Sequence, residues 1–200
     1  MLKVTYNILI GAIICILSTS FYPQSDQIQD FTLPDVVSGT DFSLSQYKNA
    51  EAVVIIFTSL YCPYAKFYDN RISKLTDEYR NNSKVRFVLI NPNNPNKSRA
   101  DALDKVAASA KSRRLGVPVL IDHLQQVTDM LGAEKTPESF VLVPQQSGSF
   151  KVVYRGAIDD NPQVAEDVRH HYLKSVINAI SQRQPIVIDN TPTTGCMIKR

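Results

Sequence analysis

The sequence predicts an α/β fold with a mixed central sheet flanked by helices. Residues 52–57 and 85–90 are unbroken apolar runs rich in β-branched side chains, which is typical of strands covered on both faces of a sheet. Between them, residues 63–80 place apolar side chains near one face of a helix. Strands that alternate with helices in this way indicate the α/β class.

Shorter segments continue the alternation along the chain. Glycine, proline and asparagine separate them, and these residues favour turns and loops. The sequence therefore predicts, in order, a hairpin of 31–35 and 41–44, a strand at 52–57, a helix at 63–80, a strand at 85–90, a loop at 91–96, a helix from Ser98 to about Arg113, a strand at 117–121, a helix at 124–131, a hairpin of 139–143 and 150–154, and a last helix from about Pro162 to Gln182.

Length and charge limit the classes of function. The chain has 200 residues, enough for one domain with a leader and a tail, and a formal net charge of +3. Basic and acidic residues are interleaved, without the basic block of a nucleic-acid groove, so we expect no nucleic acid partner. His170 and His171 read as surface residues, and no group of residues has metal-ligand spacing. We expect no metal and no cofactor.

The N-terminus has the pattern of a secretory leader. Lys3 precedes an apolar run at 8–17, and the small residues at 18–20 offer a cleavage site near Ser20. The apolar run is short for a membrane span, so we expect no stable span after cleavage; an uncleaved membrane anchor is the alternative. The sequence thus predicts a signal peptide at 1–20, a domain at 28–182, a C-terminal tail at 183–200, and export to the periplasm or the extracellular space.

The position of Cys62 predicts a reactive thiol. Cleavage of the leader removes Cys15 and leaves Cys62 and Cys196, which form either a structural disulfide or a redox pair. Pro63 is favoured at the first position of a helix and therefore places Cys62 at the N-cap. Free backbone N–H groups and the helix dipole there lower the pKa of a thiol, and Ser59 is placed to donate a hydrogen bond to the sulfur. The alternative is a buried cysteine that acts as a small hydrophobe.

Four segments resemble the redoxin family, which groups alkyl hydroperoxide reductase and thiol-specific antioxidant proteins with thioredoxin-like proteins. They are Phe57–Lys66 with its Cys-Pro, Leu131–Leu142 with its Thr-Pro, Tyr154–Asp160, and the Gly-Cys-x-Ile at 195–198. The similarity is greatest to a subgroup with a single Cys-Pro active site and a C-terminal Gly-Cys-x-Ile, and it covers residues 28–199. It implies a thioredoxin-like fold with an N-terminal β-hairpin and one strand-helix insertion, and a thiol redox activity.

The positions of residues in the sequence, together with the resemblance, give a set of expected site residues. Cys62 is the expected reactive thiolate, and Cys196 is the internal candidate for a resolving thiol, because a sulfenic acid or a mixed disulfide needs a second thiol for turnover. Thr136-Pro137 is expected to be a cis peptide next to Cys62. The expected site residues are Cys62, Cys196 and Ser59 for catalysis, and Pro63, Tyr64, Thr136, Pro137 and Arg155 for substrate binding.

The sequence leaves the reaction open. Ala65 stands where thioredoxin-type reductases have their second cysteine, and Ile55 stands where typical peroxiredoxins have a proline. Both peroxide reduction and thiol-disulfide exchange therefore remain, with a peroxide or a protein disulfide as substrate and an external thiol as reductant. The alternative is a non-catalytic thioredoxin-fold binding module with a structural Cys62–Cys196 disulfide or unpaired thiols.

Overall fold

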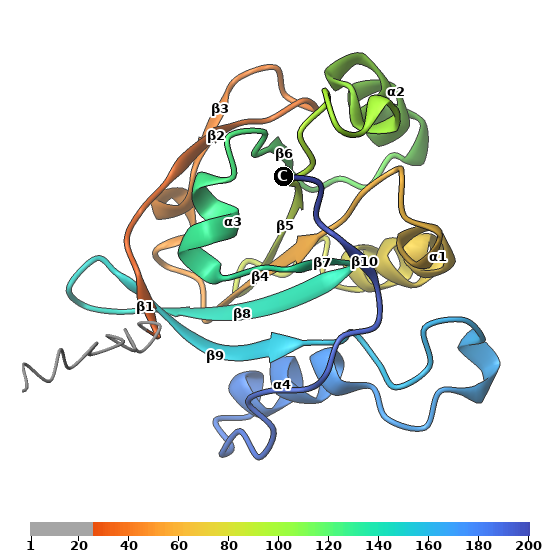
Figure 1. Ribbon diagram of the computed structural model, residues 1–200. Helices are drawn as coiled ribbons and strands as arrows, with labels where there is room; N and C mark the ends of the chain where they lie inside the picture. Colours follow the sequence, from red (N-terminus) through yellow and green to blue (C-terminus); the bar gives the residue numbers. More distant parts are fainter. Residues whose placement is uncertain (1–25) are drawn as a thin grey trace, which may run out of the picture.

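A six-stranded mixed sheet lies at the centre of the protein (Figure 1). The computed structural model describes residues 26–200, so the predicted leader and Cys15 lie outside the described residues. Within residues 26–200, no helix combines the length and the apolar character that a bilayer crossing requires. In spatial order the strands are β1 (Gln27–Ile28), β9 (Phe150–Gly156), β8 (Glu138–Pro144), β4 (Ala52–Phe57), β5 (Val85–Asn91) and β6 (Val119–Ile121).

Three parallel strands make one half of this sheet. β4 pairs in parallel with β5, and β5 with β6, whereas β8, β9 and β1 add antiparallel strands on the other side. Two small sheets accompany it: a hairpin of β2 (Thr32–Pro34) and β3 (Asp41–Ser43), and a pair of β7 (Lys135–Thr136) and β10 (Cys196–Met197). The predicted mixed sheet and the N-terminal hairpin are confirmed.

Three of the helices pack on one face of the sheet. Val54 and Ile56 of β4 pack in a core with residues of α1 (Pro63–Glu78), α2 (Leu103–Arg113) and α4 (Tyr172–Ser181). Alternate residues of a strand point to opposite faces, which explains why the whole of β4 is apolar.

The other face of the sheet has a core of its own. Val53 and Ile55 of β4 pack there with Leu33 of the hairpin, with Leu131 of α3 (Gln126–Leu131), and with Ile198 from the C-terminal segment. The sheet therefore carries two cores, as expected for an α/β fold with helices on both faces.

Two predicted helices begin later than expected. The last helix begins at Tyr172 rather than near Pro162, because Arg71 of α1 donates to the carbonyl oxygens of Asn161 and Pro162 and holds this segment outside a helix. The segment contains only the 3₁₀ turn Ala165–Asp167. The helix expected from Ser98 likewise begins at Leu103, after the 3₁₀ turn Arg99–Asp101.

Candidate active site

Cys62 lies at the N-terminus of α1, where the chain leaves β4. Its backbone is extended, its side chain makes no capping hydrogen bond, and Pro63 takes the first helical position. The first turn of α1 contains no acidic residue, so no carboxylate there competes with a thiolate for the helix N-terminus. Cys62 has no exposed surface. The predicted N-cap position is thus confirmed, with a sulfur that is enclosed by its neighbours.

Thr136 and Pro137 form one side of this enclosure. Their peptide bond is cis, as predicted. The Thr136 carbonyl oxygen lies 2.9 Å from the Sγ of Cys62, and both Thr136 and Pro137 are buried. In the reduced protein the Cys62 thiol can donate a hydrogen bond to this oxygen, and such a bond favours the protonated thiol.

Cys196 reaches the same point from the C-terminal segment. β10 pairs antiparallel with β7, and Cys196 stands directly opposite Thr136. Cys62 and Cys196 form a disulfide with 5.6 Å between their Cα atoms, and 134 residues separate them in sequence. Thr136 therefore contacts one cysteine through its carbonyl oxygen and pairs with the other through its strand.

The C-terminal segment is attached to the sheet before it reaches Cys196. The backbone of Arg155 in β9 accepts from the Thr191 N–H and donates to the Asp189 carbonyl. The Thr191 hydroxyl oxygen accepts from the Ala157 N–H at 2.9 Å and lies 2.6 Å from the hydroxyl oxygen of Tyr154. The Lys135 ammonium then donates to the Thr193 carbonyl.

A second attachment follows Cys196. Ile198 is buried in the core, and its N–H donates to the Glu134 carbonyl. The Lys199 N–H donates to the side chain of Asn93 at 2.7 Å, and its carbonyl oxygen accepts from the Asn94 N–H and from the Gln125 amide. Residues on both sides of Cys196 are thus held independently of the disulfide.

Gly195 allows β10 to lie this close to β7. A Cβ atom at this position would stand 2.4 Å from the Thr136 carbonyl oxygen and 2.8 Å from its carbon. Backbone atoms of a paired strand cannot give way as a flexible side chain can. Glycine, which has no Cβ, permits such a close approach.

Ser59 makes a different hydrogen bond from the one we expected. Its hydroxyl donates to the carboxylate of Asp101 at 3.1 Å instead of to sulfur, and it accepts from the Tyr61 N–H and from the Asn93 amide. A hydrogen bond to an ionised carboxylate is stronger than one between neutral groups. Ser59 thus belongs to the network that shapes the turn before Cys62.

Asp101 is the centre of that network, and sequence reasoning missed it. Its carboxylate also accepts from the Leu60 N–H at 2.7 Å, from the amides of Asn91 and Asn93, and from the Ser98 hydroxyl. Burial alone would raise the pKa of Asp101, but these hydrogen bonds outweigh it and hold the pKa below the usual value. Asn93 binds both Asp101 and Lys199, so one network orders the turn before Cys62 and the end of the C-terminal segment.

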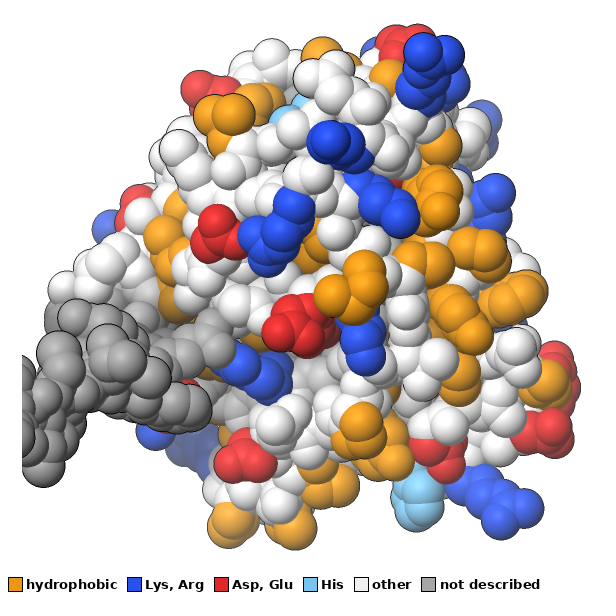
Figure 2. All heavy atoms as spheres, viewed as in Figure 1, with side chains coloured by type: hydrophobic (Ala, Val, Ile, Leu, Met, Phe, Trp, Pro, Cys, Tyr) orange, Lys and Arg blue, Asp and Glu red, His pale blue; other side chains and the backbone are white. Residues whose placement is uncertain are grey.

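The other expected site residues lie around the disulfide or beside the C-terminal segment. Pro63 is exposed and Tyr64 half-buried at the start of α1, where the Tyr64 ring packs edge-on against Phe67. Tyr61 and Phe67 are 47% and 50% exposed, and Figure 2 shows hydrophobic side chains gathered on the side where Figure 1 places α1. The thiol end of α1 therefore presents aromatic surface to solvent.

Arg155 is connected to the site by its backbone, which forms hydrogen bonds with Asp189 and Thr191 of the C-terminal segment. Its guanidinium lies over the Phe140 ring, 5.7 Å from the centroid, and donates a long hydrogen bond to the Leu131 carbonyl.

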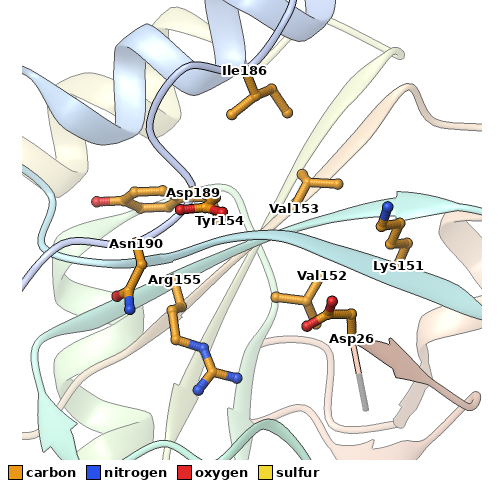
Figure 3. Close-up of a pocket in the computed structure, with 9 residues that line it drawn as sticks. All are labelled: Asp26, Lys151, Val152, Val153, Tyr154, Arg155, Ile186, Asp189 and Asn190. Atoms are coloured by element: carbon orange, nitrogen blue, oxygen red, sulfur yellow. The ribbon is translucent and has the colours of Figure 1, made fainter. Parts of the chain in front are cut away.

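A hollow of about 530 Å³ lies along β9 between Asp26 and Asn190. Figure 3 shows the Arg155 side chain pointing to the opposite side of β9 from Val153 and Ile186. This hollow is lined by β9 and by the C-terminal segment and contains neither cysteine.

These features define a class. A cysteine at the start of the first long helix, facing a cis X-Pro bond that directly precedes a central strand of a mixed sheet, is the arrangement of thioredoxin-fold thiol proteins. The chain belongs to the Redoxin family, whose model matches residues 23–169. No curated protein sequence matches the chain.

Solved structures agree with this fold. A hypothetical protein from Sinorhizobium meliloti 1021 shares 28% identity over 89% of this chain and 94% of its own, with a TM-score of 0.78. An uncharacterized conserved protein from Geobacillus kaustophilus shares 27% identity over 90% and 94%, with a TM-score of 0.79. A thiol-disulfide oxidoreductase from Bacteroides fragilis NCTC 9343, 16% identical over 63% and 86% with a TM-score of 0.51, shares the fold.

Proposed function

We propose that this chain is an exported thiol-disulfide oxidoreductase in which Cys62 and Cys196 alternate between dithiol and disulfide. The observation that carries the proposal is the disulfide between a helix N-cap and a strand paired with the cis-proline segment. Cys62 acts as the nucleophile, and Cys196 resolves the mixed disulfide that Cys62 forms with a partner protein. The proposed division is a leader at 1–20, a redox domain at 28–182 and a resolving tail at 183–200.

The polar groups around Cys62 favour disulfide exchange over peroxide reduction. Breaking a peroxide bond develops charge on oxygen, and hydrogen-bond donors aimed at that oxygen stabilise it. The Thr136 carbonyl beside the Cys62 sulfur is an acceptor and the Ser59 hydroxyl donates to Asp101, so the donors near this sulfur are backbone N–H groups at the start of α1 rather than these two residues. Disulfide exchange needs only in-line approach of sulfur and a stabilised thiolate, which the N-terminus of α1 offers.

A structural disulfide is the second candidate. Attachments on both sides of Cys196 and the complete burial of Cys62 are what a permanent cross-link would also show. A cross-link across 134 residues would stabilise the fold by restricting the unfolded chain.

Reduction with defined redox buffers separates these functions. The full-length protein with Cys15→Ser is equilibrated in dithiothreitol buffers of stepped potential, and thiols are counted by alkylation while circular dichroism follows folding. We expect a reversible two-electron transition in folded protein, catalysis of the reduction of a cysteine-containing peptide disulfide, and loss of that catalysis in Cys62→Ser. A disulfide that opens only as the fold is lost would identify the structural cross-link. Oxidation of the reduced protein by hydrogen peroxide faster than exchange would identify a peroxidase.

A further inference from the structure

We propose that the external reductant attacks the sulfur of Cys196 and releases Cys62 as the leaving thiol. This inference rests on the proposed function and assigns the order of bond breaking at the same disulfide. Cys196 then carries the mixed disulfide with the reductant, although Cys62 is the nucleophile toward the substrate.

Access favours Cys196. A thiolate attacks a disulfide in line with the S–S bond, from the side opposite the departing sulfur. In the oxidised protein Cys62 has no exposed surface, and the Thr136 carbonyl lies 2.9 Å from its sulfur, so an external thiol does not reach Cys62 while the disulfide is closed. Cys196 is partly exposed. The open approach to the disulfide therefore leads to Cys196.

The leaving group favours the same order. A thiol of lower pKa leaves faster from a disulfide. Cys62 leaves at the N-terminus of α1, where free N–H groups and the helix dipole stabilise a thiolate. Cys196 lies in a two-residue strand and has no such helix behind it. The Thr136 carbonyl opposes this advantage in part, because it accepts a hydrogen bond from the protonated thiol and none from the thiolate.

The attachments of the C-terminal segment allow this exchange to occur in the folded protein. Thr191 before Cys196 and Ile198 after it are bound by contacts that do not involve sulfur. When the S–S bond opens, the chain between these two points still holds Cys196 at the surface. The modified cysteine therefore needs no unfolding of the domain.

The two steps balance. The thiolate of a first thiol molecule forms an S–S bond with Cys196 as the bond to Cys62 breaks, and Cys62 leaves as a thiolate that takes up the first thiol's proton. A second thiol then attacks the sulfur of the bound reductant and releases Cys196 as a thiol. Two thiol molecules are oxidised to one disulfide, and Cys62 and Cys196 are both reduced.

Trapping the first step locates the attacked sulfur. The oxidised full-length Cys15→Ser protein is mixed with one equivalent of glutathione, quenched with acid at short times, alkylated and mapped by mass spectrometry. We expect glutathione on Cys196 and the alkyl group on Cys62, in at least tenfold excess over the reverse pattern. An equal or larger amount of glutathione on Cys62 would overturn the assignment while leaving the redox function intact. A disulfide that glutathione does not open in folded protein overturns both.

Paired charge variants provide an independent readout. Glutathione is an anion, so a charge beside the attacked sulfur changes its reaction rate in a salt-dependent way. Met197→Lys should react severalfold faster than Met197→Glu, because Met197 adjoins Cys196. The matched pair Phe67→Lys and Phe67→Glu, at an equally exposed position on α1, should differ little. A larger difference at Phe67 than at Met197 would place the attack at Cys62.

Discussion

The hydroxyl oxygens of Tyr154 and Thr191 lie 2.6 Å apart, and this hydrogen bond joins the C-terminal segment to β9. Both side chains are buried, and the Thr191 oxygen also accepts from the Ala157 N–H. Thr191→Val keeps the shape but leaves the Ala157 N–H unpaired and removes one of the two partners of the Tyr154 hydroxyl, which still bonds to the Ala157 carbonyl; this costs about 2 kcal/mol. In the reduced protein, where the disulfide no longer holds the segment, we expect faster hydrogen exchange in residues 190–197.

Thr193→Val is the matched control for this prediction. Thr193 lies two residues further along the same segment and contributes its carbonyl oxygen, not its hydroxyl, to the hydrogen bond with Lys135. Hydrogen exchange in the segment should change little in this variant. Equal effects of the two substitutions would mean that the Tyr154 hydrogen bond does not anchor the segment.

Gly195→Ala should disfavour the disulfide. The added Cβ would meet backbone atoms of Thr136 at 2.4 and 2.8 Å, so β10 must move away from β7. Overpacking of this kind costs about 1–3 kcal/mol. The disulfide holds β10 against β7, whereas reduction lets residues 194–197 move away, so we expect the redox potential of the Cys62–Cys196 pair to rise by up to roughly 20–60 mV. Titration against dithiothreitol measures it. Thr194→Ala, at the exposed neighbouring position, is the control and should leave the potential unchanged.

Asp101→Asn should weaken the turn before Cys62. The amide keeps the shape but replaces one acceptor oxygen by a donor, which faces donors from Leu60, Asn91 or Ser59. Hydrogen bonds to a buried charge are worth about 1.5–3 kcal/mol each, so we expect a loss of about 3 kcal/mol in the free energy of unfolding. Urea denaturation measures this loss.

The pH dependence of that loss tests the role of the charge. Because the pKa of Asp101 is lowered in the folded state, its stabilisation is present above the pKa of the unfolded chain, near ~4, and is lost as the pH falls. Wild type and Asp101→Asn should therefore converge in stability toward pH 3. A constant difference from pH 7 to pH 3 would contradict the prediction.

The fold could be predicted from local sequence patterns because the central strand β4 is buried at every position. β4 is buried on both faces, so every residue of 52–57 had to be apolar, and Pro63 marked the helix start with little ambiguity. The pattern failed at Pro162, which also resembles a helix start. There Arg71, 90 and 91 residues away, binds the carbonyl oxygens that a helix would need.

The parts of the site that could be predicted are those recognised from a residue type and its place in the order of elements. Cys62 and Thr136-Pro137 have positions that follow from the order of elements. Ser59 and Asp101 are separated by 42 residues in the sequence and are joined by a side-chain hydrogen bond. The hydrophobic periodicity of helices and strands does not predict a pair of this kind. Asn93, which links this pair to Lys199, lay in a segment that read only as a loop.

His123 should make the folded state sensitive to mild acid. Burial lowers the pKa of His123 from its usual value near 6.5, although a hydrogen bond to the Asp101 backbone and the charges of Asp101 and Asp122 oppose the shift. Its Nε2 is buried without a hydrogen-bond partner among residues 26–200. As the pH falls below ~6.5, His123 therefore takes up a proton in the unfolded chain at a higher pH than in the folded protein. The free energy of unfolding then decreases by up to ~1.4 kcal/mol per pH unit because of this residue.

His123→Gln should remove this slope between pH 6.5 and 5, whereas His171→Gln, at an exposed position before α4, should retain it. Denaturant unfolding at stepped pH measures the slope, and equal slopes in wild type and His123→Gln would assign the acid sensitivity to other groups.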